Sequence, residues 1–176
     1  AADAALPYMS EVHPSGSGNA TYAVDWFEIT NAGTNDLNIT GWRMDDNSNT
    51  FANAVPLRGI TTIPAGRSAV FFEGTAAGTT DAAIISAFST AWFGSATPPP
   101  GFLIGAYGGT GVGLGTGGDA VFLFDSAGTP ITGVTFGAAT ASATFDNTAR
   151  NSTVTTLSSV GINGAFASVT GGEIGS

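Results

Sequence analysis

Cysteine is missing from this chain of 176 residues. A disulfide, a thiolate zinc site and a cysteine nucleophile are therefore excluded. The chain does not need a covalent staple, because a globule of this size buries roughly 70% of the surface that its unfolded chain exposes. The length fits one domain.

Basic residues are also scarce. Only 10% of the residues are charged, against roughly 25% in ordinary soluble domains, and the chain has thirteen acidic residues, four arginines and no lysine, for a net charge of −9. The four arginines form no basic stripe for a phosphate backbone, so we expect no nucleic-acid binding by this domain alone. Because the longest apolar runs cover only a few residues, we also expect no membrane insertion.

Glycine is abundant, with 26 residues of 176, about double the usual share of ~7%. Glycine, threonine, serine, alanine and asparagine supply most of the surface that charged residues usually supply. This composition is typical of extracellular bacterial β-proteins, so we expect a secreted or cell-surface location. Residues Ala1 to Ala5 fit the remainder of a signal-cleavage site as well as they fit an arbitrary start of the sequence.

Short apolar segments bounded by glycine, proline and asparagine predict β-strands. In the longest, Tyr22–Asn31, Trp26 and Phe27 point to opposite faces, which indicates a central strand covered at least partly on both faces. Near a third strand at 37–39, Gly41 permits a bulge that turns Trp42 inward. The other predicted strands are Tyr8–His13, Ile60–Ile63, Arg67–Glu73, Phe102–Tyr107, Ala120–Phe124, Ile131–Phe136 and Thr144–Asp146, of which Ala120–Phe124 and Ile131–Phe136 form a hairpin.

One helix is predicted among the strands, from Asp81 to about Phe93. Thr80 or Asp81 is expected to cap its start, and Gly94 to end it in the left-handed conformation. Its apolar stripe must pack on a sheet face or a sandwich end; the stripe consists of Ile84, Ile85, Phe88 and Trp92.

Seven or more short strands, with no alternation of strand and helix, predict an all-β fold, an antiparallel β-sandwich. We interpret residues 1–176 as a single domain. It contains an insertion at about 75–107 that carries the helix, and an irregular tail that wraps the sandwich from about 150.

Several motifs occur in a recognisable order: Ser10-Glu11-Val12, Asp25-Trp26-Phe27-Glu28-Ile29-Thr30-Asn31-Ala32-Gly33, Asp36-Leu37-Asn38-Ile39-Thr40-Gly41-Trp42, Ile63-Pro64-Ala65-Gly66 and Gly117-Gly118-Asp119-Ala120-Val121-Phe122-Leu123-Phe124. Over about Met9 to Phe136, the chain resembles a lamin-tail domain. The resemblance implies an immunoglobulin-like sandwich with no catalytic residues. It implies no role for the insertion, which a short member of the family would lack.

The resemblance also carries expectations about context. Bacterial members are commonly modules of exported proteins, beside nucleases, phosphatases or surface anchors. Residues 172–176 look like the end of such a module before a continuing chain, so we expect a larger parent protein.

Residues with catalytic potential are few. His13, the sole histidine, stands beside Pro14, and no Gly-x-Ser-x-Gly elbow accompanies it, so we expect a strand-end position and not a metal or triad role. Asp25 and Glu28 should point to opposite faces of one strand, and pairs assembled across strands are invisible from sequence. The glycine-rich stretch 108–118 has no lysine and no helix after it, which favours a flexible or close-packed loop over a phosphate cradle. We expect no enzyme.

One polar cluster is a candidate calcium site: Asp45, Asp46, Asn47 and Asn49. Asp45, Asn47 and Asn49 alternate oxygen ligands as the start of a calcium loop would. Thr50 and Pro56 replace the glycine and glutamate of an EF-hand, which excludes that motif. A looser calcium site and a solvated turn stay open, and no other cofactor is expected.

Trp26, Trp42 and Trp92 are expected in the core, although exposed and coplanar tryptophans would form a platform for sugars. The sequence thus predicts a noncatalytic accessory module of an exported bacterial protein, for protein interaction, surface association or domain positioning. Its partner is an unidentified protein or cell-surface component. The alternative is a carbohydrate- or calcium-binding adhesion module.

Overall fold

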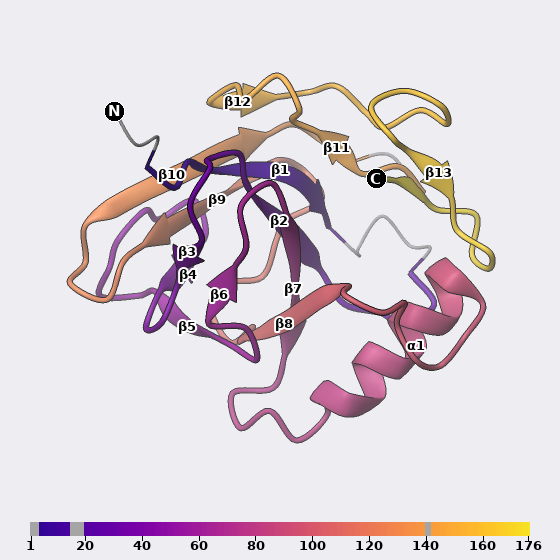
Figure 1. The fold of residues 1–176 in the computed structure, drawn as a ribbon, viewed down its shortest axis with the longest axis horizontal. Helices are drawn as coiled ribbons and strands as arrows, with labels where there is room; N and C mark the ends of the chain where they lie inside the picture. Colours follow the sequence, from indigo (N-terminus) through magenta and orange to yellow (C-terminus); the bar gives the residue numbers. More distant parts are fainter. Residues whose placement is uncertain (1–3, 15–19, 140–141) are drawn as a thin grey trace.

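The structure is a computed structural model that describes residues 4–14, 20–139 and 142–176. Two β layers pack against each other, and a single helix lies beside one of them (Figure 1). The first layer has the order β11 (Phe145–Asp146), β1 (Pro7–His13), β2 (Trp26–Asn31), β7 (Ser68–Gly74) and β8 (Leu103–Gly108). The second has the order β4 (Arg43–Asp45), β9 (Asp119–Phe124), β10 (Pro130–Phe136) and β12 (Thr153–Val154).

Strand β5 (Val55–Arg58) joins the two layers, because it pairs with β8 on one side and with β4 on the other. Most pairs are antiparallel, and β9 and β10 form the predicted hairpin. Strands β7 and β8 are parallel, because the chain between them crosses over through the helix at residues 81–93. Two small pairs complete the strands: β3 (Leu37–Asn38) with β6 (Thr62–Ile63), and β13 (Phe166–Ala167) with β14 (Ile174–Gly175).

The main core fills the space between the layers. Alternate residues of each strand point into it, so Phe27 and Ile29 of β2 meet Val121 and Leu123 of β9 in one buried cluster. Trp42 belongs to this core, and Gly41 before it has a φ of 76°, as the predicted inward turn requires. The β-sandwich inferred from the strand pattern is confirmed.

A second core covers the outer face of the first layer. Trp26, Val70, Phe72 and Ala106 point away from the main core and pack against Phe88 and Trp92 of helix α1 (Asp81–Phe93). Strand β2 is thus buried on both faces at Trp26 and Phe27, as its sequence predicted. Helix α1 closes a sheet face that would otherwise expose aromatic rings to water.

Helix α1 has the predicted bounds, and Gly94 ends it in the left-handed conformation with a φ of 73°. Thr80 is the N-cap residue, but its side chain makes no capping hydrogen bond. The carboxylate of Asp81 instead pairs with Arg58, with Nε to Oδ2 at 2.7 Å and Nη2 to Oδ1 at 2.8 Å. No helix within the described ranges is long and apolar enough to cross a membrane.

Three expectations about the elements need correction. The predicted strand at 22–31 begins only at Trp26, because Ala23 has a φ of 53° and the chain turns there. Strands β4 and β5 were not predicted: each is short, and Pro56 interrupts the apolar pattern of β5. The tail beyond residue 150 is irregular for most of its length, but it also forms β12, β13 and β14.

Candidate functional site

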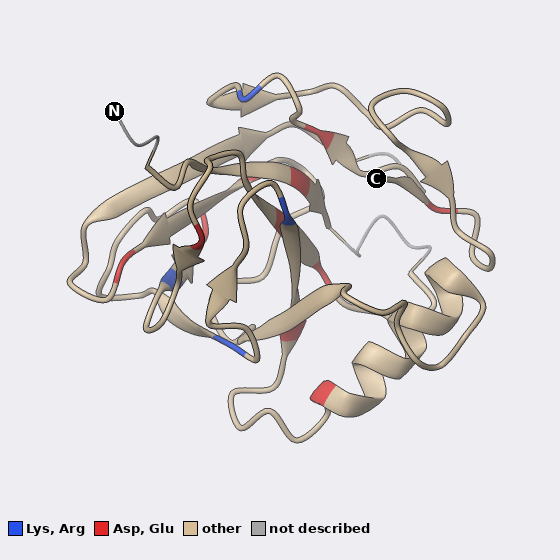
Figure 2. Cartoon of the chain, in the orientation of Figure 1, with Lys and Arg blue, Asp and Glu red and all other residues tan. Residues whose placement is uncertain are grey.

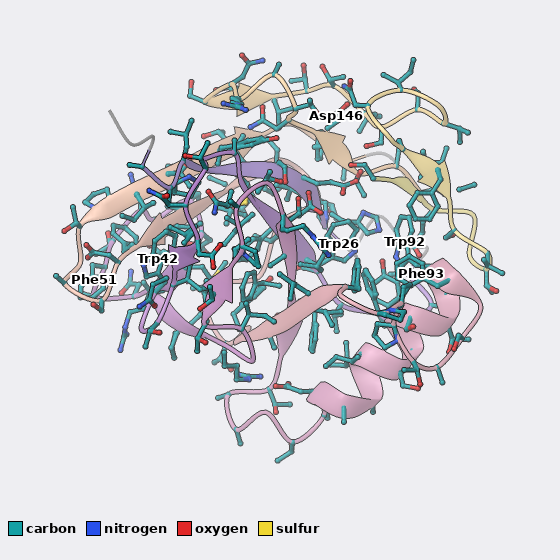
Figure 3. The ribbon with its side chains drawn as sticks, in the orientation of Figure 1. Trp26, Trp42, Phe51, Trp92, Phe93 and Asp146 are labelled. Atoms are coloured by element: carbon teal, nitrogen blue, oxygen red, sulfur yellow. The ribbon has the colours of Figure 1, made fainter. Side chains whose placement is uncertain are left out.

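A groove crosses the outer face of the first layer, between α1 and the C-terminal segment, which we define as residues 166–176. Its apolar part has a volume of about 360 Å³ and is floored by Trp26 and Val70. Figure 3 shows Trp26, Trp92 and Phe93 close together at the helix end of the molecule, whereas Trp42 and Phe51 lie toward the opposite end. The walls are aromatic rings and prolines: Phe88, Trp92, Phe93, Pro99, Pro100, Phe102 and Phe166.

A polar hollow of about 290 Å³ adjoins the apolar part. The two share Arg67, Val70 and Phe102, and the polar hollow adds Glu28 and Ser68. We call the apolar part and the polar hollow together the aromatic groove. It offers ring faces at one end and hydrogen-bonding groups with a carboxyl at the other.

Glu28 is the carboxyl of the groove. Its Oε1 accepts a hydrogen bond from Ser10 Oγ at 2.5 Å, and Thr30 Oγ1 donates to Ser10 Oγ at 2.7 Å. Thr30 Oγ1 in turn lies 2.7 Å from Ser68 Oγ, so three hydroxyls lead to this carboxyl. Burial raises the pKa of Glu28 to about 7, although the hydroxyl hydrogen bonds oppose that rise.

A second carboxyl, that of Glu11, stands directly opposite Glu28 in the pairing of β1 with β2. A register shift between Met9 and Glu11 puts Glu11 on the outer face. Its side chain is fully buried and accepts hydrogen bonds from Thr144 Oγ1 and from the backbone N–H of Ser176. Burial, and then the charge of Glu28, raise the pKa of Glu11 well above its ordinary value.

His13, Tyr22 and Glu173 form a buried polar network beneath the groove. Glu173 Oε1 lies 2.7 Å from His13 Nε2 and accepts a hydrogen bond from the Tyr22 hydroxyl at 2.6 Å. That hydroxyl accepts bonds from the indole N–H groups of Trp26, at 2.8 Å, and Trp92, at 3.2 Å. Burial and the charge of Glu173 raise the pKa of Tyr22 well above its ordinary value, so the phenol stays a donor.

This network fixes the C-terminal segment to the sheet. Glu173 joins the segment to β1 through His13, and the backbone of Ser176 joins it to β1 through Glu11. Thr170 N also donates to the carbonyl of Ala91 in α1 at 2.9 Å. The segment and the helix are therefore two walls attached to one sheet face.

The contact of His13 with Glu173 and the pairing of Glu11 with Glu28 were not predicted. His13 and Glu173 are 160 positions apart, so no local spacing indicates their contact. The alternation of Glu11 and His13 along one strand was the available signal, since it places both on one face. His13, Glu11 and Glu173 are fully buried, so the network lies below the floor of the groove.

The residues of the calcium candidate form a tight turn after β4. Asp45 is buried, and its Oδ2 accepts hydrogen bonds from Ser48 Oγ and from the backbone N–H of Thr50, both at 2.6 Å. Asp46 Oδ1 accepts one from the backbone N–H of Ser48 at 3.0 Å. In the described part of the chain, no three histidine or acidic side chains are arranged to hold a metal. Calcium binding by Asp45, Asp46, Asn47 and Asn49 stays a prediction.

We expect Asp45→Ala to lower the free energy of unfolding by about 2 kcal/mol in calcium-free buffer, because two donors of the turn lose a buried acceptor. Urea denaturation measures this loss. Adding calcium to the unmodified protein tests the metal site separately: a rise in Tm that Asp45→Ala abolishes would establish it, and an unchanged Tm would leave Asp45 as a turn residue only.

The remaining sequence candidates are part of the scaffold. The glycine-rich stretch is a close-packed loop, because Val112 and Leu114 lie in the main core and Leu114 N donates to Asp25 Oδ2 at 2.8 Å. Trp26, Trp42 and Trp92 are all buried. The expected core role of the tryptophans is thus confirmed, and they form no exposed platform.

The comparison with protein-family models matches residues 3–138 to the Lamin Tail Domain. The chain belongs to the lamin tail domain family. This confirms the resemblance and the immunoglobulin-like sandwich, a non-enzymatic type of domain that typically mediates interactions. No curated protein matches the chain.

In this lamin tail domain, the match includes the sheet face and the helix but ends before the C-terminal segment. Phe166 and Glu173 therefore come from outside the matched region. One wall of the aromatic groove thus lies outside the residues that match the family model.

Proposed function

We propose that this lamin tail domain is a noncatalytic interaction module of an exported protein, and that its aromatic groove holds an extended segment of a partner protein. The groove itself carries the proposal. Aromatic side chains in a partly enclosed surface groove are the usual anchors of protein recognition, because they bury a large apolar area with little loss of conformational entropy.

The form of the groove suits an extended chain. Its floor follows neighbouring strands, from Trp26 to Glu28 on β2 and from Val70 to Ser68 on β7. A segment lying along these strands would place an apolar side chain among the rings and its polar groups at the other end. The composition supports export, because glycine and small polar residues replace most charges.

Charge complementarity favours a cationic partner. The chain has a net charge of −9, and Figure 2 shows acidic residues on both layers with few basic ones between them. Three of the four arginines donate hydrogen bonds within the chain: Arg58 to Asp81, Arg67 to the carbonyl of Gly101 at 2.7 Å, and Arg43 to the carbonyl of Ala54 at 2.8 Å. A basic partner would be steered toward such a surface, the more so at low ionic strength.

Phe93→Ala tests the groove directly. Phe93 is a half-buried wall residue, so its truncation should weaken binding of Ac-Thr-X-Thr-Lys-Thr-NH2 peptides, with X an aromatic or large aliphatic residue, about tenfold. Intrinsic tryptophan fluorescence provides the titration. Phe51→Ala is the matched control, a half-buried phenylalanine packed on Phe124 away from the groove, and should bind normally.

Two results would count against this function. If no peptide of the set changes the fluorescence, the groove is not a peptide site. If a panel of soluble glycans gives a saturable change that Phe93→Ala removes, the carbohydrate-binding alternative replaces it.

A further inference from the structure

We infer that Glu28 selects a cationic side chain, lysine or arginine, in the segment that occupies the aromatic groove. This inference rests on the proposed function and specifies the partner that the groove accepts. It concerns a carboxyl for which neither the sequence motifs nor the family match implies a role.

Glu28 lies next to the aromatic rings along β2. Trp26 lines the apolar part of the groove and Glu28 lines the polar hollow, and the two are separated by one residue on β2, on the same face of the sheet. Residues i and i+2 of an extended peptide likewise point to one side, roughly 7 Å apart. A peptide running along β2 therefore meets the rings with one side chain and Glu28 with the next one on that side.

The charged side chain that faces Glu28 from the neighbouring strand is also acidic. It is Glu11 on β1, and the buried contact between His13 and Glu173 follows two residues farther along β1. Helix α1 has Asp81 as its single charged residue, at its first position, and residues 94–102 have none. Within the described ranges, neither Glu28 nor Glu11 forms an ion pair.

Arg67 is the one cation among the lining residues, and it does not neutralise the pair. Its Nη2 donates to the carbonyl of Gly101, which ties the guanidinium to the loop before β8. Glu28 thus lies in the polar hollow, faces the buried carboxyl of Glu11, and has no ion-pair partner among the lining residues. A cation supplied by the partner would relieve their repulsion and make a charge-assisted hydrogen bond.

The protonation of Glu28 sets the sign of the pH dependence. Its pKa is about 7, so the carboxyl is mostly neutral at pH 5.5 and mostly charged at pH 8. A lysine side chain stays cationic over this range. Binding of a lysine peptide should therefore strengthen as the pH rises through 7, whereas a peptide with glutamine in that place should bind equally at both values.

The experiment titrates two matched sets, Ac-Thr-X-Thr-Lys-Thr-NH2 and Ac-Thr-X-Thr-Gln-Thr-NH2, with X as leucine, isoleucine, phenylalanine, tyrosine or tryptophan. The expected result is about tenfold tighter binding of the best lysine peptide at pH 8 and no preference at pH 5.5. Glu28→Gln should remove both the preference and its pH dependence. Glu73→Gln is the control. Burial also raises the pKa of Glu73, but this residue lies outside the groove, so the variant should keep the lysine preference and its pH dependence.

Each alternative outcome decides between the two proposals. Equal binding of both peptide sets, still weakened by Phe93→Ala, would overturn the role of Glu28 and leave the groove as a peptide site. A lysine preference that survives Glu28→Gln would also overturn it. Failure of both sets to bind would end the proposed function and this inference together.

Discussion

Replacing Glu173 with alanine is expected to lower the free energy of unfolding by about 3–5 kcal/mol, a large loss for a single buried side chain. The change removes the acceptor that His13 Nε2 and the Tyr22 hydroxyl share. Both partners are buried, and His13 Nδ1 has no hydrogen-bond partner among the described residues, so the imidazole would lose the one partner that the structure describes. Urea denaturation at neutral pH measures the effect.

The same substitution should free the C-terminal segment before the sandwich unfolds. Amide hydrogen exchange of residues 166–176 is expected to accelerate, while that of β2 and β9 stays slow. Glu173→Gln keeps an acceptor of the same size and should cost much less. Glu73→Ala is the control for loss of a partly buried carboxyl, and we expect it to be neutral because it relieves repulsion with Asp25. A loss below 1 kcal/mol for Glu173→Ala would show that the network does not hold the segment.

Signals confined to neighbouring residues predicted the local elements well. The bounds of α1 follow from the stripe of Phe88 and Trp92 and from Gly94, whose left-handed φ ends the helix. The hairpin of β9 and β10 follows from two apolar runs joined by Asp125 and Gly128. Such features depend on backbone preferences and periodicity, which one stretch of sequence contains in full.

The candidate site was not predicted, because contacts between distant residues create it. Glu11 and Glu28 meet only through strand pairing and a register shift, and Glu173 reaches His13 from the other end of the chain. Glu28 was predicted to lie on a central strand covered at least partly on both faces, and no motif marked it as part of a site. Its altered pKa arises from the elements that cover the sheet, so its own sequence neighbourhood gave no sign of it.

The second large effect is expected for Trp92→Ala, which should lower the free energy of unfolding by about 3–5 kcal/mol. Trp92 packs at ring-centroid distances of 5.9 Å from Trp26 and 5.6 Å from Phe166, and its indole N–H donates to Tyr22. It therefore contacts the sheet, the C-terminal segment and the buried network at once. Truncation leaves a cavity that a helix fixed at both ends cannot fill.

Phe93→Ala is the matched control, since Phe93 is the next residue of the same helix but only half-buried. We expect it to cost about 1 kcal/mol or less while weakening peptide binding. At adjacent positions of one wall, Trp92→Ala thus tests the stability of the fold, and Phe93→Ala tests the binding of the peptide. If Trp92→Ala proved as mild as Phe93→Ala, α1 would be a loosely attached flap and not part of a second core, and the groove would lose the rigid wall on which its selectivity for an extended segment depends.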